Sequence, residues 1–327
     1  MNPRPDVSVV MANYNGRAFL GAAIRSLQAQ TLQDWELLFV DDGSNDDSLD
    51  RAGYFARDDK RIRLIEQRTN AGPAAARNSA IAHARGRWIA ILDSDDLMAP
   101  RRLEYLCRRA EADGATIVAD NLAIFSDEAQ AARSFLPPRF ARSAQWIGLA
   151  TYIASNCLYS RMPDLGYLKP LISARHLCPS RFLYDERLRI GEDYELMTRI
   201  LASGLRLRLD PQALYYYRKH TASFSHRMGL DSIAPLVEAN ERLTRSLVHV
   251  EPELARALKR RGRTLASLLR YDRVVRLLKH RHYRAAIAAS VTAPAIWPLL
   301  AQPIGARLWR PKPQARAVVK PAAALSE

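Results

Sequence analysis

The sequence predicts an α/β fold in which a mostly parallel sheet is flanked by helices. Short apolar runs alternate with stretches of helical periodicity between Val7 and Leu92, and that alternation is typical of parallel strands joined by crossover helices. Polar sequences directly follow three of the runs, namely Asn13-Tyr-Asn-Gly16, Asp41-Asp-Gly-Ser44 and Asp93-Ser-Asp-Asp96. Because ligands bind beyond the carboxyl ends of parallel strands, we expect these three sequences to converge on one edge of the sheet.

The individual elements are predicted from hydrophobic periodicity and from the residues that typically begin and end helices and strands. The predicted strands are the apolar runs Val7 to Met11, Trp35 to Val40, Arg61 to Ile65 and Trp88 to Leu92. The predicted helices are 18–30, 46–57 and 70–84, the last with Pro73 in its first turn. Farther on, the sequence predicts a helix after Pro100, an apolar strand-like run at 116–119, a loop at 126–142, a helix opened by Gly191-Glu-Asp-Tyr194 and a short strand at 205–209.

Composition bounds the class of protein. The 327 residues suffice for one large α/β domain with an extension or for two domains, and a 48% hydrophobic content predicts a sizeable core. The three cysteines are few, odd in number and far apart, which favours a reducing compartment over a disulfide framework or a zinc site. The apolar run after Asp6 has only five residues, which is too short for a signal peptide.

The net charge of +15 suits nucleic acid, an anionic membrane face or phosphorylated substrates. Composition does not choose among them. We expect no nucleic-acid partner, because the chain lacks a recognised zinc, helix-turn-helix or RNP signature.

Asp93, Asp95 and Asp96 stand within four positions at the end of a predicted buried strand. Neighbouring carboxylates raise one another's pKa unless something neutralises them. Oxygen ligands select a hard cation such as Mg²⁺ or Mn²⁺, and Mg²⁺ favours one or two carboxylates completed by substrate phosphates. The alternative is an acidic turn that caps the helix beginning near Pro100.

Four motifs in order carry a resemblance to a known family: Asp41-Asp-Gly-Ser44, Asp93-Ser-Asp-Asp96, Gly191-Glu-Asp-Tyr194 and Tyr217-Arg-Lys-His220. Together they resemble glycosyltransferase family 2, whose members are inverting enzymes of the GT-A fold. The resemblance covers roughly Asp6 to His226. Within it, the stretch from Phe182 to Ser225 looks most like bacterial exopolysaccharide glucosyltransferases of the succinoglycan type.

The resemblance implies a donor site for a UDP-sugar. Tyr14 matches the ring that stacks on uracil, and Asp42 matches the carboxylate that accepts a hydrogen bond from the uracil N–H; a planar π face and one acceptor suit that base. Arg77 matches the basic residue opposite the diphosphate and the donor sugar. Without the family context, Tyr14 would be a partly buried turn tyrosine and Arg77 a helix-surface arginine.

The resemblance also implies the catalytic groups. Asp93 matches a carboxylate near the ribose and the metal, Asp95 a direct ligand of Mg²⁺ or Mn²⁺, and His220 a further metal or diphosphate contact. Asp193 matches the general base that takes the acceptor hydroxyl proton during inversion. The alternative for Asp193, together with Glu192, is that the two charges merely favour a helix N-terminus.

Three parts are predicted: a catalytic domain at 1–228, a basic helical extension at 229–310 and a flexible tail at 311–327. The segment Ala285 to Ala306 has no charged residue but contains three prolines, and arginines flank it on both sides. It suits an interfacial segment on an anionic leaflet. The alternative is that the extension is a helical subdomain packed on the catalytic core.

These expectations define a function. We expect an inverting transferase that moves a hexose, with glucose preferred, from a UDP-sugar to a hydroxyl of a lipid-linked oligosaccharide in exopolysaccharide biosynthesis. We expect it in the cytoplasm, peripheral on the inner face of the cell membrane. The alternatives are transfer of another sugar to lipopolysaccharide or capsule, and a non-catalytic nucleotide-sugar-binding protein.

Overall fold

A computed structural model describes residues 4–126, 131–140, 142–220, 230–248, 250–301 and 318–319, and the account below concerns those residues. The first four strands are parallel neighbours in the order β3-β2-β1-β4. Their bounds are Val7–Asn13 (β1), Trp35–Asp41 (β2), Ile62–Glu66 (β3) and Trp88–Ile91 (β4), joined by Arg17–Gln28 (α1), Ser48–Asp58 (α2) and Pro73–His83 (α3). The strand and helix predictions for this part are confirmed within a few residues.

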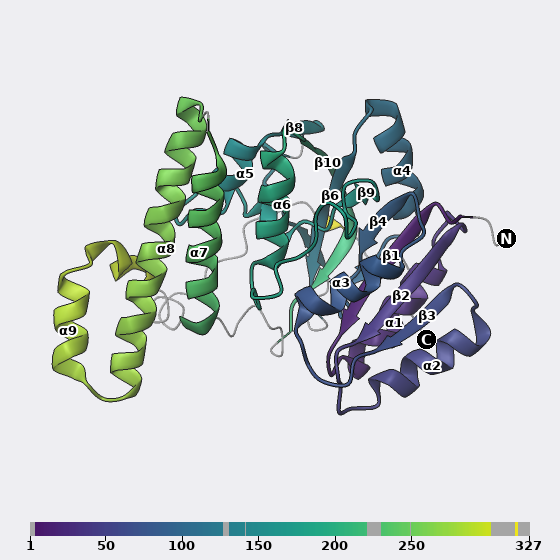
Figure 1. The fold of residues 1–327 in the computed structure, drawn as a ribbon, viewed down its shortest axis with the longest axis horizontal. Helices are drawn as coiled ribbons and strands as arrows, with labels where there is room; N and C mark the ends of the chain where they lie inside the picture. Colours follow the sequence, from purple (N-terminus) through teal and green to yellow (C-terminus); the bar gives the residue numbers. More distant parts are fainter. Residues whose placement is uncertain are drawn as a thin grey trace.

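Strands β1, β2 and β4 are buried on both faces, as is typical of parallel strands covered by helices, whereas β3 at the edge of the sheet is partly exposed. Every residue of β2 is buried, and so is nearly every residue of β1. Figure 1 shows these strands together at one side of the molecule, with helices around them. The carboxyl ends of β1, β2 and β4 therefore form one edge, which carries the polar sequences.

The second half of the sheet is mixed, and it continues the parallel strands β1 to β4 in the α/β fold that the sequence predicts. Its strands are Leu97–Met98 (β5), Ile117–Phe125 (β6), Ala132–Ser134 (β7), Gln145–Ile147 (β8), Leu171–Ser173 (β9), Leu207–Arg218 (β10) and Val318–Val319 (β11). Strand β9 lies antiparallel between β4 and β6, whereas β10 runs parallel to β6 and antiparallel to β5 and β8. Antiparallel pairing needs no crossover helix, so short strands from connecting segments complete the sheet.

Two local predictions change as a result. The strand expected at 205–209 continues to Arg218, and the loop expected at 126–142 contains β7. The remaining helices of this half are Arg102–Asp113 (α4), Leu149–Ser155 (α5), the 3₁₀ turn Leu165–Tyr167 (η1) and Glu192–Ala202 (α6). The helix predicted to open at Gly191-Glu-Asp-Tyr194 is confirmed, with Gly191 at its N-cap.

The C-terminal helices are Leu230–Ser246 (α7), Pro252–Lys279 (α8), Tyr283–Val291 (α9) and the 3₁₀ turn Pro294–Ile296 (η3). Helices α7 and α8 pack on the catalytic part: Leu236 and Leu265 cluster with Leu188, and the buried Arg261 donates 2.6 Å to the Asn156 carbonyl. The alternative of a subdomain packed on the core is therefore correct for α7 and α8. Figure 1 shows α9 beyond α8, on the side away from the parallel strands.

Within the described residues, no single helix is long and apolar enough to cross a membrane. Two consecutive segments, Tyr283–Val291 and Pro294–Ala301, together have the length and apolar composition of a membrane span, but they are bent by 103° relative to one another. The predicted tail at 311–327 lies outside the described residues apart from β11, as does the end of the predicted interface segment.

Candidate active site

The polar sequences at the strand ends do converge. The Asn13 side chain donates 3.1 Å to the Asp41 carboxylate, and the Asp42 N–H donates 2.8 Å to the Asn13 carbonyl. A Cβ atom at Gly16 would lie 2.9 Å from the Ser94 hydroxyl, so the turn after β1 touches the acidic loop after β4. The edge predicted from the parallel strands is confirmed.

Asp42 and Tyr14 lie on the β2 side of this edge. The buried Asp42 carboxylate accepts from the N–H groups of Ala71 and Gly72, at 2.7 and 2.8 Å. Those bonds hold the loop that leads into α3, and a carboxylate keeps further acceptor capacity for a nucleobase N–H. Tyr14 is 49% exposed, so its ring has open surface for stacking. Their roles toward uracil stay predictions.

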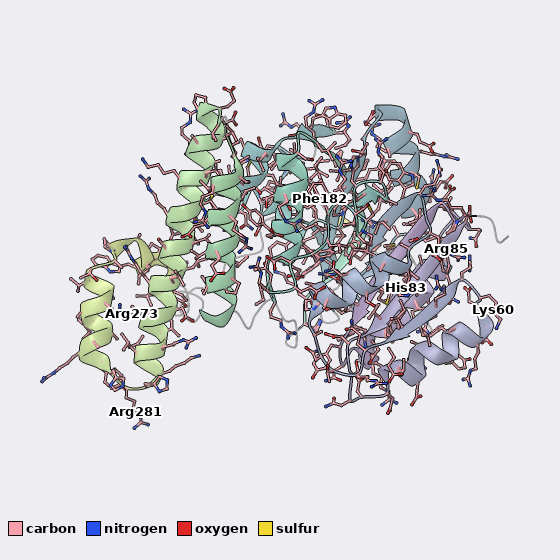
Figure 2. All side chains as sticks on the ribbon, in the orientation of Figure 1. Lys60, His83, Arg85, Phe182, Arg273 and Arg281 are labelled. Atoms are coloured by element: carbon pink, nitrogen blue, oxygen red, sulfur yellow. The ribbon has the colours of Figure 1, made fainter. Side chains whose placement is uncertain are left out.

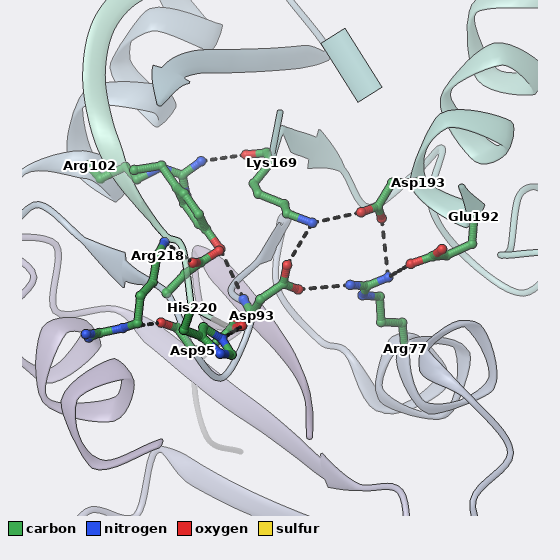
Figure 3. A network of polar contacts seen from close by, with 11 residues as sticks. Arg77, Asp93, Asp95, Arg102, Lys169, Glu192, Asp193, Arg218 and His220 are labelled. Atoms are coloured by element: carbon green, nitrogen blue, oxygen red, sulfur yellow. Dashed lines mark hydrogen bonds and ion pairs between the residues drawn. The ribbon is translucent and has the colours of Figure 1, made fainter. Parts of the chain in front are cut away.

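The centre of the site is an ion-pair network that joins four separate segments (Figure 3). Arg77 on α3 reaches Glu192 at 2.6 Å, Asp93 at 2.9 Å and Asp193 at 3.4 Å. Lys169, which precedes β9, lies 2.8 Å from one oxygen of Asp93 and 2.8 Å from one oxygen of Asp193. Asp93 and the candidate base Asp193 therefore share the same two cations. Arg77 is buried, which excludes the helix-surface alternative.

The electrostatics of the network favour its charged forms. Burial alone would raise the pKa of Asp193 and of Asp93, but the nearby charges of Lys169 and Arg77 outweigh it and hold both pKa values below their usual range. Burial and the neighbouring Asp193 charge raise the pKa of Glu192 despite its bond to Arg77. Asp193 is therefore an ionised carboxylate, which is the form that accepts a proton.

Lys169 was not found from the sequence. The signal available was one lysine inside the apolar run Tyr167-Leu-Lys-Pro-Leu-Ile172, because a charge among buried neighbours needs a partner. Its backbone is held as well: Arg102 donates 2.5 Å to the Lys169 carbonyl and 2.8 Å to Asp120. The Arg102 and Asp120 side chains are fully buried, so this anchor belongs to the centre of the fold.

A second cluster lies beside the first, at the end of β10. His220 Nε2 lies 2.9 Å from Asp95 Oδ2. Asp96 accepts from the Arg218 N–H at 2.7 Å and from the Tyr215 hydroxyl at 2.8 Å. Burial and the charges of Asp95 and Asp93 raise the pKa of Asp96 well above its usual range. Asp96 therefore ties the acidic loop to β10, while Asp95 and His220 face one another.

The donor set offers a partial cation site. Among the described residues, no group of three or more histidine, cysteine, aspartate or glutamate side chains is arranged to hold a metal ion. Asp95 and His220 supply one carboxylate oxygen and one imidazole nitrogen, which fits a cation whose remaining ligands are phosphates and water. Both Asp93 oxygens already pair with Arg77 and Lys169. A direct metal contact by Asp93 stays a prediction.

Comparisons with known proteins agree with this architecture. The sequence profile described as "Glycosyl transferase family 2" matches residues 8–166, a range that includes Asp42, Arg77, Asp93 and Asp95. The succinoglycan biosynthesis protein ExoO of Rhizobium meliloti (strain 1021) is 38% identical over 94% of this chain and 87% of its own length. ExoU of the same organism is 36% identical over 68% of this chain and 65% of its own length.

Solved structures show the same fold at low sequence identity. S. aureus TarS 1-349 in complex with UDP-GlcNAc is 19% identical, with a TM-score of 0.62 over 77% of this chain and 69% of that chain. The mannosyltransferase PcManGT from Pyrobaculum calidifontis, in complex with GDP-Man and Mn²⁺, is 20% identical, with a TM-score of 0.58 over 95% of this chain and 82% of that chain. The sequence motifs, the strand-end site and these relatives agree, and the chain belongs to glycosyltransferase family 2 and has the GT-A fold.

Proposed function

We propose that this protein is an inverting, metal-dependent hexosyltransferase of exopolysaccharide biosynthesis, with a UDP-sugar as donor and a lipid-linked oligosaccharide as acceptor. The observation that carries the proposal is the Lys169 bridge, which lies 2.8 Å from both Asp93 and Asp193. It keeps the candidate base one side chain away from the donor-side carboxylate. The bridge thus fixes Asp193 beside Asp93, at the strand-end edge that carries the residues proposed to bind the nucleotide.

In this proposal the chain's own residues bind the nucleotide, orient the diphosphate and take the proton of the acceptor. Tyr14 and Asp42 hold the base of the nucleotide, and Arg77 faces the diphosphate. Asp193 accepts the proton of the acceptor hydroxyl as its oxygen attacks the anomeric carbon. Asp95 and His220 would hold Mg²⁺ or Mn²⁺, which when bound stabilises the charge of the departing diphosphate.

The choice of donor rests on Tyr14 and Asp42 and on the relatives. An aromatic face and a carboxylate acceptor suit uracil. TarS was solved with UDP-GlcNAc, and PcManGT with GDP-Man and Mn²⁺, so structural neighbours bind nucleotide-sugars. ExoO carries the name of a succinoglycan biosynthesis protein, which supports a role in making exopolysaccharide. Glucose is the sugar we propose, from the resemblance to the succinoglycan-type enzymes.

The membrane part of the proposal rests on α9. Tyr283, Ile287 and Val291 are spaced four residues apart, so they share one face of the helix. They are 57%, 62% and 64% exposed, and Trp297 just beyond is 53% exposed. No acidic residue stands between Asp272 and Glu327 in the sequence. Figure 2 shows Arg281 at the tip between α8 and α9.

An apolar face bordered by arginine and lysine suits an anionic bilayer surface, where apolar burial and charge attraction add. We therefore propose that α9 lies on the inner leaflet of the cell membrane and brings the site to its lipid-linked acceptor. On this view the chain is cytoplasmic and peripheral.

The test is incubation with a panel of radiolabelled UDP-sugars and membranes of a cell that makes the polymer, followed by linkage analysis. We expect label in one lipid-linked product, with inversion at the anomeric carbon. Asp193→Asn should lower transfer about 10²- to 10⁴-fold and leave UDP affinity unchanged. Equal losses of transfer and of UDP affinity would mean that Asp193 only supports the start of α6.

A further inference from the structure

Three aromatic rings from distant segments meet beside the candidate active site. Tyr167 of η1 packs edge to face against Phe135, at 6.2 Å between centroids, and against Tyr217 of β10, at 6.0 Å. We call Phe135, Tyr167 and Tyr217 the aromatic wall. Tyr167 is 41% exposed, and Phe135 and Tyr217 are each partly exposed. A tyrosine pair that serves the core looks different, since Tyr152 and Tyr194 stack on one another and are both buried.

The aromatic wall adjoins the groups proposed to carry the chemistry. Tyr167 stands two residues before Lys169, which spans about 7 Å of extended chain, and the Lys169 ammonium touches Asp193. Tyr217 shares a face of β10 with Tyr215, because alternate residues of a strand point the same way. The Tyr215 hydroxyl bonds to the Asp93 N–H at 3.2 Å, so that face of β10 leads to the acidic loop.

The donor and the acceptor must reach Asp193 from different sides. The proposed nucleotide residues, Tyr14 and Asp42, lie at the ends of β1 and β2. The aromatic wall comes from the residue after β7, from η1 and from β10, on the other half of the sheet, and its Tyr167 lies two residues before Lys169, which contacts Asp193. The wall and the proposed nucleotide residues therefore lie on opposite halves of the sheet.

The chemistry of the wall fits a sugar ring. A pyranose has an apolar face of C–H groups and a rim of hydroxyls, and aromatic side chains offer a large rigid apolar surface. A tyrosine adds a hydroxyl that can donate or accept at the rim. Stacking would fix the orientation of a flexible glycan end, and orientation of the attacking hydroxyl is a large part of catalysis.

We propose that the aromatic wall is the acceptor subsite, on which the terminal sugar of the acceptor glycan stacks while one of its hydroxyls reaches Asp193. The inference rests on the proposed function, because it takes Asp193 as the base and a glycan as the acceptor. It adds the surface that selects the acceptor and orients it.

The test separates acceptor binding from donor binding. Tyr167→Ala should raise the concentration of lipid-linked acceptor extract needed for half-maximal transfer about three- to tenfold, as expected from the loss of one aromatic contact. UDP affinity by calorimetry should stay at the wild-type value, and the thermal midpoint should fall by only a few degrees, because the ring loses its two edge-to-face contacts. Tyr167→Phe keeps the ring and should keep most of the acceptor affinity.

Tyr54→Ala is the matched control. Tyr54 is 53% exposed and lies on α2, which Figure 1 shows beside β3 and away from α6, the helix of Asp193, so its loss should leave acceptor saturation unchanged. The inference is refuted if Tyr167→Ala saturates with acceptor like the wild type, or if UDP affinity falls in parallel. A wild-type protein that transfers from no UDP-sugar gives a different result, which overturns the proposed function and this inference with it.

Discussion

Replacing Lys169 with methionine is the sharpest test of the ion-pair network. The substitution keeps the length and the apolar stem but removes the ammonium between Asp93 and Asp193. The Lys169 side chain is 7% exposed, and the two carboxylates are 23% and 19% exposed, so water replaces little of the lost contact. Arg77 then remains as the one cation shared by Asp93, Asp193 and Glu192 among the contacts described for these carboxylates.

Removing one partner of a buried ion pair typically costs about 3–5 kcal/mol, because the remaining charge is left uncompensated. Since Arg77 still compensates both carboxylates in part, we expect the lower end, about 3 kcal/mol. For a chain of 327 residues, whose unfolding entropy is about 2.1 cal/mol/K per residue, that corresponds to a fall of roughly 4 °C in Tm. The Asp193 carboxylate also loses the ion pair that holds its position, and a displacement of about 1 Å in a catalytic group can lower kcat about 10²-fold.

The assays are heat and urea unfolding followed by circular dichroism, with kcat measured on the folded fraction. Lys169→Arg keeps the charge and should lose less stability. Arg87→Met is the matched control, because Arg87 pairs with Asp6 at 2.8 Å while both are exposed, at 50% and 32%. Such a pair contributes about 1 kcal/mol or less. If Lys169→Met lowered Tm no more than Arg87→Met, the Lys169 ion pairs would contribute no more to stability than an exposed pair, and our reasoning would be wrong.

Three further predictions follow from other parts of the chain. Excess EDTA should abolish transfer, and Asp95→Asn should weaken UDP binding in the presence of Mg²⁺, measured by calorimetry; full activity in EDTA would refute the cation site. Ile287→Ser with Val291→Ser should reduce cosedimentation with anionic vesicles, whereas Val248→Ser should not, because Val248 is 86% exposed but lies in the connection before α8, away from α9. Glu36 is buried, which opposes ionisation, but hydrogen bonds from Ser8 and Arg85 outweigh burial and lower its pKa below 4.5. Its stabilising contribution is therefore present above pH 4.5 and lost as pH falls through the folded-state value, so Glu36→Gln should flatten the acid side of a plot of Tm against pH.

The sequence by itself determined the parallel half of the fold. Apolar runs and helical periods are local patterns, and β1 to β4 with their helices lie where those patterns place them. Parallel strands bring their carboxyl ends to one edge, so the convergence of Asn13 and Asp41 could be predicted without coordinates. The start of α6, which carries Asp193, could be predicted from a glycine followed by two acids.

Only the tertiary structure decided how the charges pair and how the second half of the chain is arranged. Arg77 and Asp193 are 116 residues apart, and Lys169 is 24 residues from Asp193, so no local period reports their contact. The strand β9 has only three residues, which is too short for a periodic pattern to predict it. It lies between β4 and β6 because its backbone groups form hydrogen bonds with both strands. The role of Lys169 also depends on the fold, because its partners Asp93 and Asp193 come from other segments of the chain. A buried ammonium is stable only beside such carboxylates.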